Sequence, residues 1–102
     1  MNVVREDVEK LVDKELEAAT ERFGLHHSWH EKYAVIKEEF DEAQDELNEM
    51  LFDLKVMWKN VKRNDTDYAD DISEDLYNAA IRLACEAIQV AAMCKKEIEN
   101  DA

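Results

Sequence analysis

The sequence predicts an all-α protein, a bundle of three long helices in a single domain over residues 1–102. Its 102 residues contain one glycine, Gly24, and no proline, too few turn residues for a sandwich or barrel. Hydrophobic residues make up 46%, which is ordinary for a globular domain and high for a disordered acidic chain. Apolar residues also recur at three- and four-residue steps, the helical period.

The first helix is predicted from about Asn2 to Phe23. Its apolar positions, among them Val4, Val8 and Leu11, follow the helical period. Gly24 comes directly after Phe23 and is typical of a helix end, because glycine adopts the left-handed conformation there without strain.

The second helix is predicted from about Trp29 to Val61, on the order of 50 Å long. Ser28 and Glu31 have the spacing of a capping box at its start. On a helical wheel, one arc collects the apolar residues, and we expect this stripe to be buried. The stripe consists of Trp29, Ile36, Phe40, Ala43, Leu47, Met50, Leu51, Leu54, Trp58 and Val61.

The third helix is predicted from about Ile72 to Glu99, after a polar connection over residues 63–70. Asp71 and Glu74 have the spacing of a second cap. Three helices of this size bury only about 60–65% of the unfolded surface, and the second is too long for its neighbours to cover. We therefore expect a homodimer or higher homo-oligomer, in which helices from several chains complete the bundle.

The formal charge of −13 argues against nucleic acid and anionic membranes as partners, because both repel an acidic chain. No export signal and no apolar run of roughly 20 residues is visible. Cys85 and Cys94 lie nine residues apart on one predicted helix and point to opposite sides, so they cannot pair with each other. We expect a reduced, cytoplasmic protein.

An acidic segment on the second helix is the first candidate for chemistry. Between Glu38 and Leu54 there are eight acids and no base. The simplest interpretation is a solvated face, although surface helices normally mix signs because like charges one turn apart repel. A divalent cation would relieve that repulsion. Glu39, Glu42 and Glu46 lie at the border with the apolar stripe, where the wall of a cleft would be.

A polar pair inside an apolar run is the second candidate. Glu86 and Gln89 are the only polar residues from Ala84 to Cys94, apart from the cysteines, and their spacing of three puts them on one helix face. A carboxylate in a buried run needs a partner: a lysine, an arginine or a metal. The alternative is a solvent-facing stripe in which Glu86 pairs with Arg82.

Together the two segments offer Glu-x-x-Glu and Glu-x-x-Gln from two helices, as in carboxylate metal sites inside helical bundles. Oxygen donors of this kind suit Mg²⁺ or Mn²⁺ better than zinc. The predicted ligands are Glu39, Glu42, Glu86 and Gln89.

These motifs resemble those of the MazG-like, all-α nucleoside triphosphate pyrophosphohydrolases, in particular small prophage-type members. Glu38-Glu39-Phe40-Asp41-Glu42 matches the family's Glu-Glu-x-x-Glu, and Glu86-Ala87-Ile88-Gln89 matches its Glu-x-x-Asp except at the last position. The resemblance extends over about residues 28–94. It implies a Mg²⁺-dependent hydrolase that converts a nucleoside triphosphate to the monophosphate and pyrophosphate, with Glu38 as second ligand or base.

Gln89 in place of aspartate leaves the site with one charge fewer, which also fits a catalytically weakened relative. The alternative class is a non-enzymatic acidic helical protein of phage or prophage origin that acts by interaction. His26, His27 and His30 cluster near Trp29, but they lack a fourth zinc ligand at a suitable spacing. We expect that cluster to pack against the core or to line the mouth of the cleft.

Overall fold

The computed structural model describes residues 3–23 and 28–100 of the chain. It has three α-helices: α1 (Arg5–Phe23), α2 (Trp29–Lys62) and α3 (Ala69–Asn100). No strand occurs among the described residues. The prediction of an all-α bundle is therefore confirmed.

The helices begin and end close to the predicted residues, with one cap confirmed and one wrong. The Ser28 side chain accepts a hydrogen bond from the Glu31 backbone N–H at 3.2 Å, as the capping box predicts. α3 begins at Ala69, three residues earlier than predicted, so Asp71 and Glu74 lie inside the helix and do not cap it. Asp71 instead adds negative charge to the first turn, where the helix dipole favours it.

Two other predicted boundaries have different outcomes. α1 begins at Arg5 rather than near Asn2, after a turn at residues 3–4. Gly24, the predicted end of this helix, lies outside the described residues.

α2 ends at Lys62, and Asn64 in the turn that follows has a left-handed φ of 53°. Asparagine tolerates that region better than most residues.

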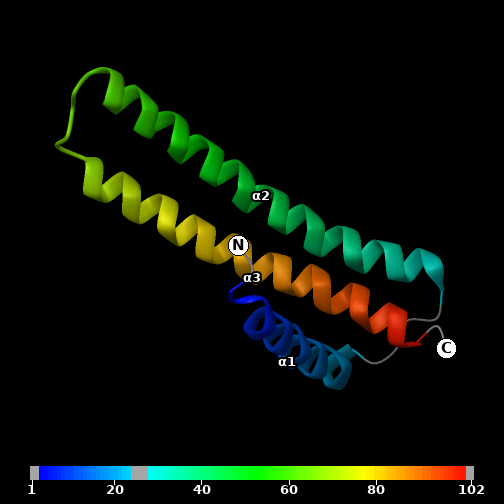
Figure 1. Cartoon of the computed structure of the whole chain (residues 1–102). Coiled ribbons are helices and arrows are strands. Elements are labelled where there is room, and N and C mark those ends of the chain that lie inside the picture. The colour runs from blue at the N-terminus through cyan, green and yellow to red at the C-terminus, as the bar shows by residue number, and fades with distance from the viewer. Residues whose placement is uncertain (1–2, 24–27, 101–102) are drawn as a thin grey trace.

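α3 lies in the middle of the fold. α2 runs antiparallel along one side of it and α1 packs along the C-terminal half of its other side (Figure 1). The molecule measures 57 × 29 × 22 Å, a flat and elongated shape. Among the described residues no helix is long and apolar enough to cross a membrane. Cys85 and Cys94 are both free thiols.

The hydrophobic core is small and sits where α1 and the N-terminal part of α2 meet α3. Its buried side chains are Val12, Ala92 and Met93. Partly buried apolar side chains of all three helices pack against them: Leu16, Ala19, Val35, Ile36 and Ile88. The far half of the α2–α3 hairpin has no third helix beside it, and there Ala79 is buried outside this cluster (Figure 1).

The apolar stripe predicted to be buried on α2 is mostly exposed, so that prediction is wrong for the single chain. Trp58 is 59% exposed and Phe40 55%. The face that α2 turns to α3 is rotated by roughly a quarter turn towards the acidic arc, and it includes the partly buried Glu39, Glu46 and Asp53. α2 therefore contacts α3 through the border of the stripe, and the centre of the stripe stays exposed to solvent.

A buried ion pair joins the start of α2 to the end of α3. Lys32 Nζ lies 3.4 Å from Glu97 Oε2, and the two side chains are 10% and 7% exposed. Lys32 also lies over the Trp29 ring, 4.3 Å from its centre. Two charges this far from water are stable only as a pair. The pair therefore fixes how the two helix ends meet.

We predict that Lys32→Met destabilises the protein by about 3 kcal/mol, because the buried Glu97 carboxylate would lose the cation 3.4 Å away. Lys37→Met is the matched control: Lys37 pairs with Asp41 on the exposed face of the same helix. Urea denaturation followed by circular dichroism measures both variants. Equal unfolding midpoints for the two would contradict the structural role assigned to the Lys32–Glu97 pair.

Candidate metal site

Three carboxylates from two helices come together midway along the α2–α3 pair. Glu39 and Glu42 lie one turn apart on α2, and Glu86 projects from the opposing turn of α3. One oxygen from each carboxylate lies within 4.8 Å of the other two. The i, i+3 spacing puts the first two on one face, and the antiparallel packing brings the third level with them. We call these residues the three-carboxylate cluster.

Two of these carboxylates carry an oxygen with no hydrogen-bond partner. Glu39 Oε2 and Glu86 Oε2 are both buried and both unsatisfied, whereas Glu42 is exposed. Burying an anionic oxygen without a donor or cation is costly. A bound cation would supply the positive charge that these two buried oxygens need for their stabilisation.

The surroundings of Glu86 favour its protonated form. Burial, a hydrogen bond with Glu42 and the negative charges of Glu42, Glu39 and Glu46 together raise the pKa of Glu86 to about 7. A carboxylate that titrates near neutral pH releases its proton readily when a cation takes the proton's place.

Glu39 is shifted in the same direction. Burial is the largest cause that raises the pKa of Glu39, followed by the charges of Glu42 and Glu38, a hydrogen bond with Glu42, and the charge of Glu15. Glu15 belongs to α1, so all three helices contribute negative charge to this region. Glu15 was not predicted as part of this site, because the spacing of acids along one helix does not show which residue of another helix will lie near them.

Arg82 does not neutralise the cluster. Its Nε donates to Glu46 Oε2 at 2.8 Å, which joins α3 to α2 one turn away. The pairing of Glu86 with Arg82 that the sequence left open is therefore not formed. Within residues 3–19 and 28–98, whose side chains the structure describes, no lysine or arginine forms an ion pair with Glu39 or Glu86.

The other predicted site residues lie around the cluster and not in it. Glu38 is exposed, and its charge acts on Glu39. Gln89 is partly buried one turn beyond Glu86. His30 is exposed at the start of α2, while His26 and His27 lie outside the described residues. Three of the four predicted ligands thus come together.

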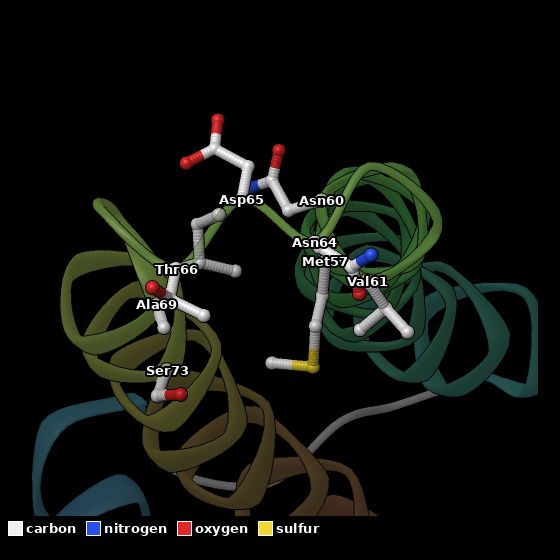
Figure 2. Close-up of a pocket in the computed structure, with 9 residues that line it drawn as sticks. Met57, Asn60, Val61, Asn64, Asp65, Thr66, Ala69 and Ser73 are labelled. Carbon is white, nitrogen blue, oxygen red and sulfur yellow. The ribbon is translucent and has the colours of Figure 1, made fainter.

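A separate cavity of about 340 Å³ lies at the turn of the hairpin, where α2 connects to α3. Met57 projects between the two helices towards Ser73, and Asp65 and Asn60 lie at its outer edge (Figure 2). Met57 is fifteen residues beyond Glu42 on α2, or roughly 22 Å at 1.5 Å per residue. The cavity therefore does not belong to the three-carboxylate cluster.

Comparisons of this chain with protein-family models, curated proteins and solved structures give no match.

The raised pKa of Glu86 makes stability depend on pH. In the unfolded chain this carboxyl titrates near its usual value of 4.5, and in the folded chain near 7. Its contribution is therefore fully present below about pH 4.5 and is lost as the pH rises through 7. Without divalent ions we expect Glu86 to lower stability by on the order of 1–2 kcal/mol between pH 5 and pH 8.

Thermal unfolding in EDTA across this range measures the effect. Glu86→Gln should flatten the profile and unfold at a higher temperature than the wild type at pH 8. Asp45→Asn, which removes one exposed acid of the same helix outside the cluster, should leave the slope unchanged. A wild-type slope retained in Glu86→Gln would show that another group titrates.

Proposed function

We propose that the three-carboxylate cluster holds Mg²⁺ or Mn²⁺ and that the protein hydrolyses a nucleoside triphosphate to the monophosphate and pyrophosphate. The observation that carries this proposal is the pair of buried oxygens without partners, Glu39 Oε2 and Glu86 Oε2, on two of the three carboxylates that cluster with Glu42. Their chemistry fits a hard divalent cation, which oxygen ligands bind preferentially.

Charge supports the same conclusion. An acidic chain with a formal charge of −13 repels a triphosphate. A site that takes up divalent cations reverses that local repulsion. The resemblance of Glu38-Glu39-x-x-Glu42 and Glu86-x-x-Gln89 to the MazG-like motifs adds the substrate class, a nucleoside triphosphate.

The chain's residues have distinct roles in the proposed reaction. Glu39, Glu42 and Glu86 hold the cation, which when bound neutralises the triphosphate and lowers the pKa of a water molecule. Glu38, exposed beside Glu39, accepts the proton of the attacking water at its carboxylate. The water oxygen bonds to the α-phosphorus while the bond from that phosphorus to the α–β bridging oxygen breaks, so that pyrophosphate leaves. Gln89 offers only a neutral amide oxygen, so the site has one charge fewer than the family pattern.

A non-enzymatic interaction protein is the second candidate. The exposed apolar stripe of α2 favours it, because an apolar surface of that length is typical of a protein that binds another chain. Both candidates agree with a reduced, cytoplasmic setting and with the two free thiols.

Cation binding is tested first by thermal unfolding at pH 8. Magnesium or manganese at about 100-fold over the dissociation constant adds about 2.7 kcal/mol to stability, a shift on the order of 10 °C for a domain of this size. Glu86→Gln should lose the shift, and Asp45→Asn should keep it. The shift should shrink between pH 8 and pH 6, because protons compete for Glu86. Indifference of the wild type to both ions would favour the interaction protein.

Catalysis is tested with a panel of ribonucleoside and deoxyribonucleoside triphosphates and Mg²⁺ or Mn²⁺. We expect pyrophosphate release from at least one of them and a loss of roughly 100-fold or more in Glu39→Gln and Glu86→Gln, which remove ligands of the site. Asp45→Asn is again the control. Cation binding without pyrophosphate release from any substrate would leave a metal-binding protein that is not this enzyme.

A further inference from the structure

A long apolar stripe on α2 faces solvent in the single chain. Its large side chains are between 47% and 68% exposed. They recur along the whole helix on the side turned away from the acidic arc. The exposed members are Trp29, Phe40, Leu47, Leu51, Leu54, Trp58 and Val61, and the exposed Tyr33 lies beside them.

α3 extends this apolar surface across the hairpin. Arg82 lies on the acidic side of the molecule. It pairs with Glu46, and the negative charge of Glu49 is among the causes that raise the pKa of Arg82. Ala84 and Ala91 lie about half a turn round α3 from Arg82 and are exposed. The α2 stripe lies about half a turn from Glu49. The stripe and these alanines therefore share the side of the hairpin opposite the acids.

The surface thus combines large side chains on α2 with both small and large ones on α3. Leucines and aromatics lie along α2, and Ala84, Ala87 and Ala91 form a row on α3. Tyr77, seven residues before Ala84 on the same face, is 64% exposed. When such a hairpin meets a copy of itself through a two-fold axis, α2 of each copy lies against α3 of the other. The large side chains then fill the space above the alanines, as ridges fill grooves.

The molecule is also more open than a monomer of its mass. Its accessible surface is 8034 Å², whereas a folded monomer of 11.9 kDa exposes about 6,000 Å². Its radius of gyration is 17.5 Å, against about 13 Å for a compact domain of this length. The excess of about 2,000 Å² exceeds the roughly 800 Å² per partner that a stable interface buries.

The charge distribution allows two acidic copies to meet there. The carboxylates lie on the opposite side of the hairpin, so contact through the apolar surface does not bring them together. Lys37, Lys55 and Lys59 follow the stripe on its edge away from α3, which places bases nearer to the second copy than acids.

We propose that a second copy of this chain covers the apolar surface of the α2–α3 hairpin, so that the two hairpins form a four-helix core with the three-carboxylate clusters on its outer sides. This interface does not depend on the proposed metal site or on catalysis. It extends the core, whose buried cluster in the single chain lies where α1 and the N-terminal part of α2 meet the C-terminal half of α3.

Light scattering after size-exclusion chromatography tests the proposal. The buffer contains EDTA, so that cation binding does not affect the measured mass. The wild type at micromolar concentration should have twice the chain mass of 11.9 kDa. The variant Leu47→Glu/Leu54→Glu should have the mass of one chain, because two charges on each copy would be buried. Asn48→Glu/Asn78→Glu, with the same charge change at two exposed positions outside the apolar surface, should remain a dimer.

Tryptophan fluorescence provides a second readout that needs no variant. Both tryptophans, Trp29 and Trp58, belong to the stripe. In the dimer both should be shielded from acrylamide and should emit at shorter wavelength than after dilution to the single chain. This measurement decides the matter if the glutamate variant loses its helical circular dichroism.

Three results would overturn the proposal. These are a wild-type mass of one chain up to about 100 μM, a dimer that persists in a folded Leu47→Glu/Leu54→Glu variant, and tryptophans that acrylamide quenches freely in the wild type. A wild-type monomer that gains a helical partner of another kind on the stripe would likewise exclude the second copy as its occupant.

Discussion

The rotation of α2 about its own axis governs both the candidate site and the exposed surface. α2 does not turn the centre of its apolar stripe towards α3. It presents a face about a quarter turn away, which includes Glu39, Glu46 and Asp53. This orientation places carboxylates in the contact between the two helices and leaves Phe40 and Trp58 exposed to solvent. The carboxylate cluster and the apolar surface are therefore two consequences of the same packing.

Such a contact is stable only where its charges are compensated. Arg82 reaches across to Glu46, and Lys32 meets Glu97 where α2 begins and α3 ends. Between these two bridges, no described lysine or arginine pairs with Glu39 or Glu86, whose unsatisfied oxygens remain. Two ion pairs thus join α2 to α3. The three-carboxylate cluster lies between these ion pairs, and a divalent cation would contribute most to stability there.

Much of the local structure was predictable because it depends on neighbours in the chain. The scarcity of glycine and proline and the helical period led to three helices, and Ser28 caps α2 as its spacing to Glu31 indicates. The start of α3 was predicted three residues too late, because acidic residues such as Asp71 and Glu74 are almost equally common as helix caps and within the first turn of a helix. The burial of the apolar stripe was also predicted wrongly, because a helical wheel shows which residues share a face but not which face meets a neighbour.

The sequence by itself determined the all-α class and the pairing of Glu39 with Glu42 on one helix face, since both follow from backbone geometry over a few residues. Only the tertiary structure decided that Glu86 lies level with that pair, that Arg82 binds Glu46 in place of Glu86, and that Glu15 of α1 adds its charge nearby. These depend on the register and rotation of whole helices, which are set by the sum of many contacts distant in sequence.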